Sequence, residues 1–206
     1  MSTPTTTTPP HQITLRPLTP SDWPLWRRLR LHALSESPHA FGATLAEWQG
    51  PAGDLETRWR ARLSIPGSRN FVAFLGRGGG EVGEAGEDEE DEEEGEPVGM
   101  GSGVPVSSSA GEGSGNPDGG GVVEVISVWV HPKARGKGVG HRLLQGIEAW
   151  AVGEGKTVMR LSVMLSNAAA VGLYRRNGLR ETGREGDEPA PGREREVEME
   201  KVLRRS

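Results

Sequence analysis

Apolar residues gather in two stretches of the chain, residues 12–75 and 122–182, and the sequence between them is rich in Gly, Glu and Ser. In the first stretch Ile13 and Leu15 alternate with polar neighbours, as in a half-exposed strand. Ser21 then offers an N-cap for a following helix. The chain is therefore expected to open with a strand followed by a helix.

A second helix and a second strand are predicted further along the first stretch. Residues 54–63 form the next helical stretch. The apolar run at residues 70–75 is short and ends at glycines, which is typical of a strand bounded by chain-breaking residues.

The middle of the chain is predicted to contain two flexible insertions around a short strand. Only residues 97–100 and, less clearly, residues 104–106 resemble a strand there. The rest has too few apolar side chains to offset the entropy lost on ordering. We therefore expect insertions at about residues 77–96 and 107–121, on either side of a strand that completes a hairpin-like meander.

The second apolar stretch predicts the central part of the fold. Residues 122–130 are almost continuously apolar and β-branched, as in a strand buried on both faces. Apolar residues then recur at helical spacing through residues 139–151. A strand at residues 158–165, a short helix at residues 167–176 and a half-exposed strand near residues 196–200 follow. This order implies an α/β fold with a mixed sheet and helices on its faces.

The composition limits the class of protein. At 206 residues the chain suits one domain, which we assign to residues 12–206, after a disordered Thr- and Pro-rich tail at residues 1–11. Because the chain has no cysteine, disulfides, zinc–thiolate sites and a cysteine nucleophile are excluded. No apolar run has the length of a membrane span, and the first residues lack a leader pattern. We therefore expect a cytoplasmic protein, or a nuclear one, that has no membrane partner.

The net charge of −5 hides a mildly basic remainder. Eleven acidic residues lie between Glu81 and Glu96, and without them the chain has 24 basic and 18 acidic residues. The simplest interpretation of the acidic run is a solvated loop, with docking of a basic substrate or covering of a basic cofactor site as alternatives. The remainder suits an anionic cofactor but lacks the clustered basic stripe of a nucleic-acid-binding protein. No nucleic-acid partner is therefore expected.

The candidate chemistry lies in the loop between the central strand and the next helix. Gly136, Gly138 and Gly140 let the backbone approach a ligand closely and turn its N–H groups inward. The helix N-terminus adds partial positive charge, and Arg135 and Lys137 add full charges. Together these features predict a site for a pyrophosphate.

Two other phosphate-binding loops fit less well. A Rossmann fingerprint needs glycine where His141 stands, and no acidic residue follows about twenty positions later to hold a ribose. A P-loop needs Gly-Lys-Ser/Thr, but Gly138 follows Lys137. A glycine-rich turn without a ligand is the simplest alternative.

The loop resembles a known family signature. Residues 135–140 match the R/Q-x-x-G-x-G/A pattern of the Gcn5-related N-acetyltransferase (GNAT) superfamily. Residues 128–132, 166–170 and 173–179 also resemble the family, in order and spacing. The resemblance is strong over residues 122–183 and weak before them.

The resemblance implies a fold and a cofactor. The fold has six to seven strands in a mostly antiparallel sheet, with a central splayed parallel pair and about four flanking helices. Residues 39–42 also look like a segment common in small bacterial-type members. The implied cofactor is acetyl-CoA, with its pantetheine along the central strand and its pyrophosphate on the loop amides. The implied cofactor-binding residues are Val128, Trp129, Val130, Arg135, Gly136, Lys137, Gly138, Val139, Gly140, His141 and Asn167.

Tyr174 is the implied proton donor to the departing thiolate, and elementary chemistry agrees. A phenol pKa of about 10 lies near the thiol value of about 8.5. Asn167 and Tyr174 are seven residues apart, so on a helix they share a face, about 10 Å apart along the axis. The alternative for Tyr174 is a core aromatic residue whose hydroxyl bonds the backbone.

The general base is less clearly marked. Family members that acetylate protein N-termini often carry glutamate at the strand position where this chain has Ser162. Glu124 lies eleven residues before Arg135, the spacing at which histone-acetylating relatives place their catalytic glutamate. A solvated carboxylate at the strand end, or a water chain acting as the base, is left open.

These features predict direct transfer of acetyl from acetyl-CoA to an amine, with small molecules slightly favoured over peptides. Three alternatives stay open: transfer to a hydroxyl, transfer of a longer acyl chain, and a non-catalytic acyl-CoA-binding module that recruits a partner. Whether the chain forms a homodimer is also open. No metal is expected, because His11, His32 and His39 lack the spacing of metal ligands.

Overall fold

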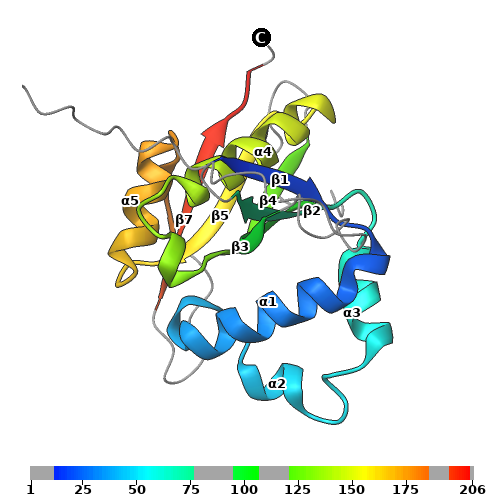
Figure 1. Cartoon of the computed structure of the whole chain (residues 1–206). Helices are drawn as coiled ribbons and strands as arrows, with labels where there is room; N and C mark the ends of the chain where they lie inside the picture. Colours follow the sequence, from blue (N-terminus) through cyan, green and yellow to red (C-terminus); the bar gives the residue numbers. More distant parts are fainter. Residues whose placement is uncertain (1–11, 77–94, 107–120, 186–194, 205–206) are drawn as a thin grey trace, which may run out of the picture.

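The computed structural model describes residues 12–76, 95–106, 121–185 and 195–204. These residues form a seven-stranded sheet with helices on both faces (Figure 1). The predicted tail at residues 1–11 and most of both predicted insertions lie outside the described residues.

The sheet has the strand order β1-β2-β3-β4-β5-β7-β6. Neighbouring strands are antiparallel except for β4 and β5, which are parallel. The predicted α/β arrangement with one central parallel pair is therefore confirmed. The strands are β1 (Ile13–Pro17), β2 (Arg69–Leu75), β3 (Glu96–Pro105), β4 (Val122–Val130), β5 (Val158–Met164), β6 (Arg180–Glu185) and β7 (Glu196–Val202).

Two apolar clusters attach the helices to the sheet. Helices α4 and α5 pack on one face, around buried residues such as Leu143 and Ile147. Helices α1 and α3 pack on the other face, around Trp26 and Trp59 (Figure 1). The described residues thus contain one α-helix more than the four or so predicted, namely α1 (Trp23–Glu36), α2 (Leu45–Gln49), α3 (Glu56–Leu63), α4 (Val139–Gly153) and α5 (Ala168–Arg176).

The two central strands part soon after they begin. β4 and β5 are in register only over Val122–Glu124 and Val158–Arg160. A bulge follows in β4, where Ser127 has a φ of 58° and the register to β3 shifts. In the described part of the chain no strand pairs with the β5-facing edge of β4 beyond Glu124. The backbone groups of that half of β4 are therefore open to a ligand.

Strand β3 is one continuous strand of ten residues, longer than the short one predicted from the sequence. Its glycines favoured a loop in the prediction, but they are sites of close packing. A Cβ at Gly99 would lie 2.9 Å from Val139, and one at Gly103 would lie 2.4 Å from Trp150. Helix α4 thus lies directly against the backbone of β3, where a larger side chain has no room.

Two local predictions were wrong. Ser21 is not the N-cap of α1, because it lies inside a short 3-10 helix (Pro20–Asp22) that precedes α1. The backbone N–H and hydroxyl of Thr19 instead donate to Asp22 Oδ2, each at 2.7 Å. Strand β4 is fully buried only at Val123, Val125 and Trp129, because the layer of α1 and α3 contacts it mainly at Trp129.

Candidate active site

A cavity of about 510 Å³ opens where β4 parts from β5, beside the N-terminus of α4. All the predicted site residues except Lys137 and Glu124 line it. The structure therefore brings the strand, the glycine loop and the face of α5 into one site. The predicted residues in its wall are Val128, Trp129, Val130, Arg135, Gly136, Gly138, Val139, Gly140, His141, Asn167 and Tyr174.

The glycine loop leaves the first turn of α4 without a side-chain cap. Gly136 and Gly138 have φ values of 77° and 88°, a left-handed conformation that favours glycine. Gly138 is itself the N-cap of α4, so no side chain accepts from the first amides of the helix. Uncapped amides at a helix N-terminus form an anion site, and this one lies in the wall of the cavity.

Gly140 has a packing role next to this anion site. A Cβ at Gly140 would lie 2.8 Å from Leu173 Cδ2. Helices α4 and α5 therefore meet closely at this point. Their contact closes one wall of the cavity between the loop and Tyr174.

The sequence had suggested that Arg135 carries a free charge, but in the structure this charge is paired. Its Nη2 donates to Glu36 at 2.6 Å and its Nε donates to the Val130 carbonyl at 3.1 Å. The guanidinium thus fixes the start of the loop against β4 and α1. The uncapped amides of α4 are therefore the donors in this wall that remain open to an anion.

Tyr174 lies on α5 with only 8% of its surface exposed. Burial raises its pKa to about 12, so the phenol keeps its proton at neutral pH. Its hydroxyl has no hydrogen-bond partner among the described residues, unlike that of a core tyrosine bonded to the backbone. Because the side chain lines the cavity, the proton of the hydroxyl can go to a ligand.

Asn167 and Tyr174 line the same cavity, as their spacing on one helix face predicted. Asn167 is the N-cap of α5, and its Oδ1 accepts from the Ala170 amide at 3.1 Å. That bond fixes the side-chain amide and leaves its nitrogen without a described partner. Asn167 can therefore donate to a ligand.

His141 joins the first turn of α4 to the end of α5. Its Nδ1 shares a hydrogen bond of 2.7 Å with Asn177 Oδ1. Asn177 in turn donates through Nδ2 to the Leu173 carbonyl at 2.8 Å. This chain of contacts holds the two helices that flank the cavity in a fixed relation.

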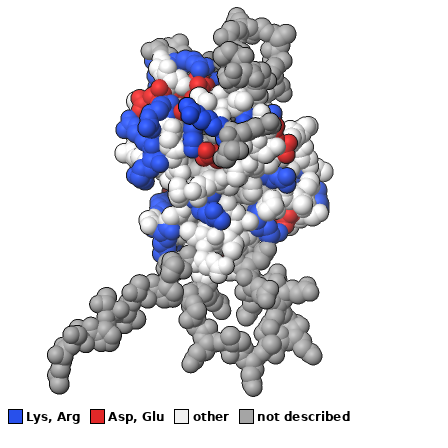
Figure 2. Space-filling model, turned by 90° about the horizontal axis from the view of Figure 1, so that it is seen from above, with Lys and Arg blue, Asp and Glu red and all other residues white. Residues whose placement is uncertain are grey.

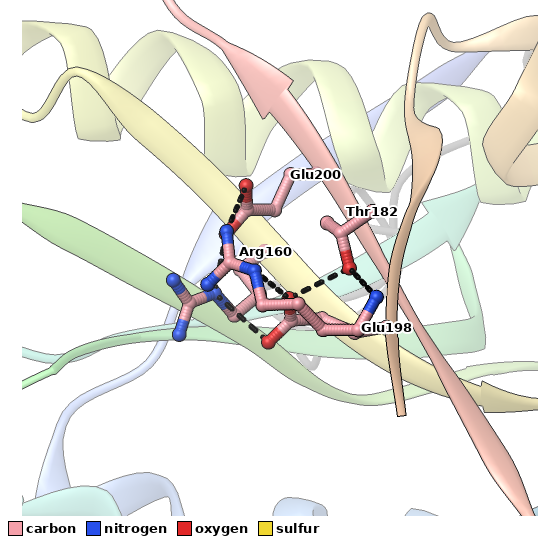
Figure 3. Close-up of polar contacts among 5 residues, drawn as sticks. Arg160, Thr182, Glu198 and Glu200 are labelled. Atoms are coloured by element: carbon pink, nitrogen blue, oxygen red, sulfur yellow. Dashed lines mark hydrogen bonds and ion pairs between the residues drawn. The ribbon is translucent and has the colours of Figure 1, made fainter. Parts of the chain in front are cut away.

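Glu124 is the last residue of β4 in register with β5, where its partner is Arg160. The Arg160 guanidinium already bonds two carboxylates of β7, with Nε at 2.7 Å from Glu200 and 3.3 Å from Glu198. Thr182 of β6 donates to Glu198 as well, so the network ties three strands together (Figure 3). Glu124 is half-buried at the point where the sheet opens but does not line the cavity, and its role as base stays a prediction.

The sequence analysis missed the part of the wall that follows α1. Its only sign in the sequence was the resemblance of residues 39–42 to bacterial-type relatives, which assigned no role to them. These lining residues are far from the loop in sequence and are brought to it by the fold. The lining residues not predicted are Ser37, Ala40, Phe41, Ala134, Ala169, Ala170, Leu173 and Arg176.

Charged side chains on the surface agree with a basic folded part. In the view from above, Lys and Arg side chains occupy more of the described surface than Asp and Glu (Figure 2).

Within the described residues, no three His, Asp or Glu side chains form a group that could hold a metal ion. None of the described helices is long and apolar enough to cross a membrane.

Comparison with known proteins shows a similarity to one family of acetyltransferases. The sequence matches the model of the acetyltransferase (GNAT) family over residues 84–179. Over these residues, just under half of the chain, the sequence resembles a GNAT acetyltransferase domain. The match includes the central strand, the glycine loop, α4, β5 and α5. All of these except β5 contribute residues to the wall of the cavity.

Solved structures share the GNAT fold over nearly the whole chain. One is yncA, a candidate acetyltransferase from Salmonella typhimurium with its cofactor acetyl-CoA, which is 24% identical, with a TM-score of 0.59 over 95% of this chain and 96% of that one. A ribosomal-protein-alanine N-acetyltransferase from Brucella melitensis is 26% identical, with a TM-score of 0.59 over 92% and 99%. Spermidine N-acetyltransferase from Vibrio cholerae, in complex with CoA and spermine, is 17% identical, with a TM-score of 0.64 over 93% and 96%.

Proposed function

We propose that the protein transfers the acetyl group of acetyl-CoA directly to an amine within a ternary complex. The observation that carries this proposal is the single cavity that joins the open edge of β4, the uncapped amides of α4 and the Tyr174 hydroxyl. These are the three elements that a thioester with a diphosphate tail needs, namely a strand edge, an anion site and an acid. The solved relative with acetyl-CoA bound supports the choice of cofactor.

The cofactor would be held mainly by backbone groups. The amides of the loop and of the first turn of α4 suit the diphosphate. The unpaired edge of β4 near Val128 suits the amide-rich pantetheine, which can pair with it as an added strand would. The Asn167 side-chain nitrogen can add a further donor at the start of α5.

The transfer needs one base and one acid. The amine nitrogen attacks the thioester carbonyl carbon, the C–S bond breaks, and the surplus proton on nitrogen leaves to a base. We assign the base to Glu124, or to water where the sheet opens. Backbone N–H groups near Val128 would polarise the carbonyl oxygen, and Tyr174 would pass its proton to the sulfur.

The raised pKa of Tyr174 fits a donor that acts late in the reaction. A phenol with a pKa of about 12 holds its proton more firmly than a thiol with its usual pKa of about 8.5. However, a thiolate that leaves into the same water-poor wall has a raised pKa too. Tyr174 would therefore first stabilise the developing charge through a hydrogen bond and complete the transfer as the C–S bond breaks.

The fold does not select the acceptor, since solved relatives named for a ribosomal-protein alanine and for spermidine share it. The test is thiol release from acetyl-CoA with a panel of primary amines, polyamines, amino acids and peptide N-termini. We expect release with at least one amine and no release with matched alcohols. Intact binding of coenzyme A without release from any acceptor would instead favour a non-catalytic binding module.

A further inference from the structure

Glu36, the last residue of α1, gathers three hydrogen bonds from three different parts of the molecule. Its carboxylate accepts from the Ser37 hydroxyl at 2.5 Å, from Trp129 Nε1 at 3.1 Å and from Arg135 Nη2 at 2.6 Å. Ser37 follows α1, Trp129 lies on the central strand and Arg135 begins the glycine loop. One carboxylate thus joins the end of α1 to both halves of the predicted cofactor site.

The charge on Glu36 is permanent in the working pH range. Burial alone would raise the pKa of Glu36, but the hydrogen bonds from Ser37, Arg135 and Trp129 outweigh it and lower the pKa to about 2. The side chain is 25% exposed and that of Arg135 49%. Charge-assisted hydrogen bonds of this kind are about twice as strong as neutral ones, so the contact fixes geometry despite its partial exposure.

The residues that follow Glu36 form part of the cavity wall. Ser37, Ala40 and Phe41 all line the cavity, although none of them belongs to the strand, the loop or α5. Phe41 lies against the buried guanidinium of Arg30, 4.6 Å from its ring centre. Two contacts therefore hold this part of the wall in position. One is the packing of the Phe41 ring against Arg30, and the other is the set of hydrogen bonds to the Glu36 carboxylate that precedes the wall.

We propose that Glu36 is a positioning residue for the acceptor amine. It holds residues 37–41 at the cavity by anchoring α1 to Arg135 and Trp129. The inference rests on the proposed function, because it assigns the wall at residues 37–41 to the acceptor and the glycine loop to the cofactor. Glu36 itself would touch neither substrate.

The central test is Glu36→Gln. The amide keeps the shape of the side chain, but it loses the charge and turns either its oxygen or its nitrogen toward the Arg135 donor. We expect the KM for the amine with the fastest thiol release to rise about tenfold, the loss of roughly one charge-assisted hydrogen bond. The Kd for coenzyme A should change by about threefold or less, because the backbone amides that hold the diphosphate are untouched.

A second substitution separates positioning from a direct effect of charge. In the double variant E36Q/R135Q two amides face each other and can bond without charge. Glutamine is also accepted at this position by the R/Q-x-x-G-x-G/A pattern. We expect the KM for the amine to recover at least half of its increase on a logarithmic scale. No recovery in a folded double variant would contradict the positioning role.

Hydrogen exchange supplies a readout that does not need turnover. In Glu36→Gln the backbone N–H groups of Ser37 and residues 39–41 should exchange faster, while those of β3 and β5 stay unchanged. Glu56→Gln removes an exposed ion pair with Arg60 on α3 and should alter neither exchange nor kinetics. Unchanged exchange at residues 37–41 would overturn the inference. Absence of thiol release by the wild-type protein would refute only the proposed function.

Discussion

Tyr174→Phe tests the site most directly, because Tyr174 is the only tyrosine in the chain. The substitution removes one hydroxyl that has no hydrogen-bond partner among the described residues and keeps the ring that packs in the core. At neutral pH the free energy of unfolding should therefore change by less than about 1 kcal/mol. If Tyr174 is the acid, turnover should fall by about 10² to 10⁴, with little change in the Kd for coenzyme A.

The burial of Tyr174 also predicts how the free energy of unfolding changes with pH. Burial raises the pKa of Tyr174 from 10.0 to about 12. The pKa of Tyr174 is higher in the folded protein than in the unfolded chain. The contribution of its protonated phenol to the free energy of unfolding is therefore fully present below pH 10, and it is lost as the pH rises from 10 to 12. Two pKa units correspond to about 3 kcal/mol. The Phe variant has no phenol and should lack this loss.

Two assays test these values. The near-ultraviolet absorbance of phenolate reports Tyr174 alone, so a titration of the folded protein should show ionisation about two pH units later than in the unfolded chain. Urea unfolding of both proteins between pH 9 and pH 11 should show the wild type losing stability relative to the variant. An ordinary pKa in the folded protein, together with unaltered turnover of the variant, would refute both the burial argument and the assigned role.

Further predictions concern packing, charge and the loop. Gly103→Ala places a Cβ 2.4 Å from Trp150 and should lower the free energy of unfolding, measured with a denaturant, by about 1–3 kcal/mol. The control Gly153→Ala, whose Cβ would have nothing within 4 Å, should leave the free energy of unfolding unchanged or raise it slightly. Arg30→Met replaces a guanidinium whose pKa is lowered to about 10 by burial and by the nearby charge of Arg62. The substitution should raise the melting temperature, because it removes a buried charge. A clear fall in the melting temperature would contradict the cost assigned to that charge. Gly138→Ala, at a φ of 88°, should cost about 1–2 kcal/mol and weaken coenzyme A binding in calorimetry; unchanged affinity would argue against the anion site.

The sequence predicted what depends on local pattern. The helical spacing of Asn167 and Tyr174 and the strand–glycine–helix order around Gly138 depend only on neighbouring residues, and they placed these residues in one cavity correctly. Family resemblance supplied the splayed pair, because no periodicity indicates where two strands part.

What escaped prediction depends on contacts between distant residues. The glycines of β3 have the composition of a loop, and only the position of Trp150 and Val139 above them shows that they are packing sites. Likewise, Glu36 and Arg135 are 99 residues apart. Nothing in the sequence near Arg135 indicates that its charge is already paired.

The junction between β4 and β5 has a mechanical consequence. β4 and β5 are in register over only three residue pairs, and the rest of the contact between the two halves includes the side chains of the core cluster under α4 and α5. A molecule seated in the opening and bonded to both sides would act as a cross-link between the halves. Its binding should therefore stiffen the whole domain and raise the melting temperature in proportion to the logarithm of ligand concentration.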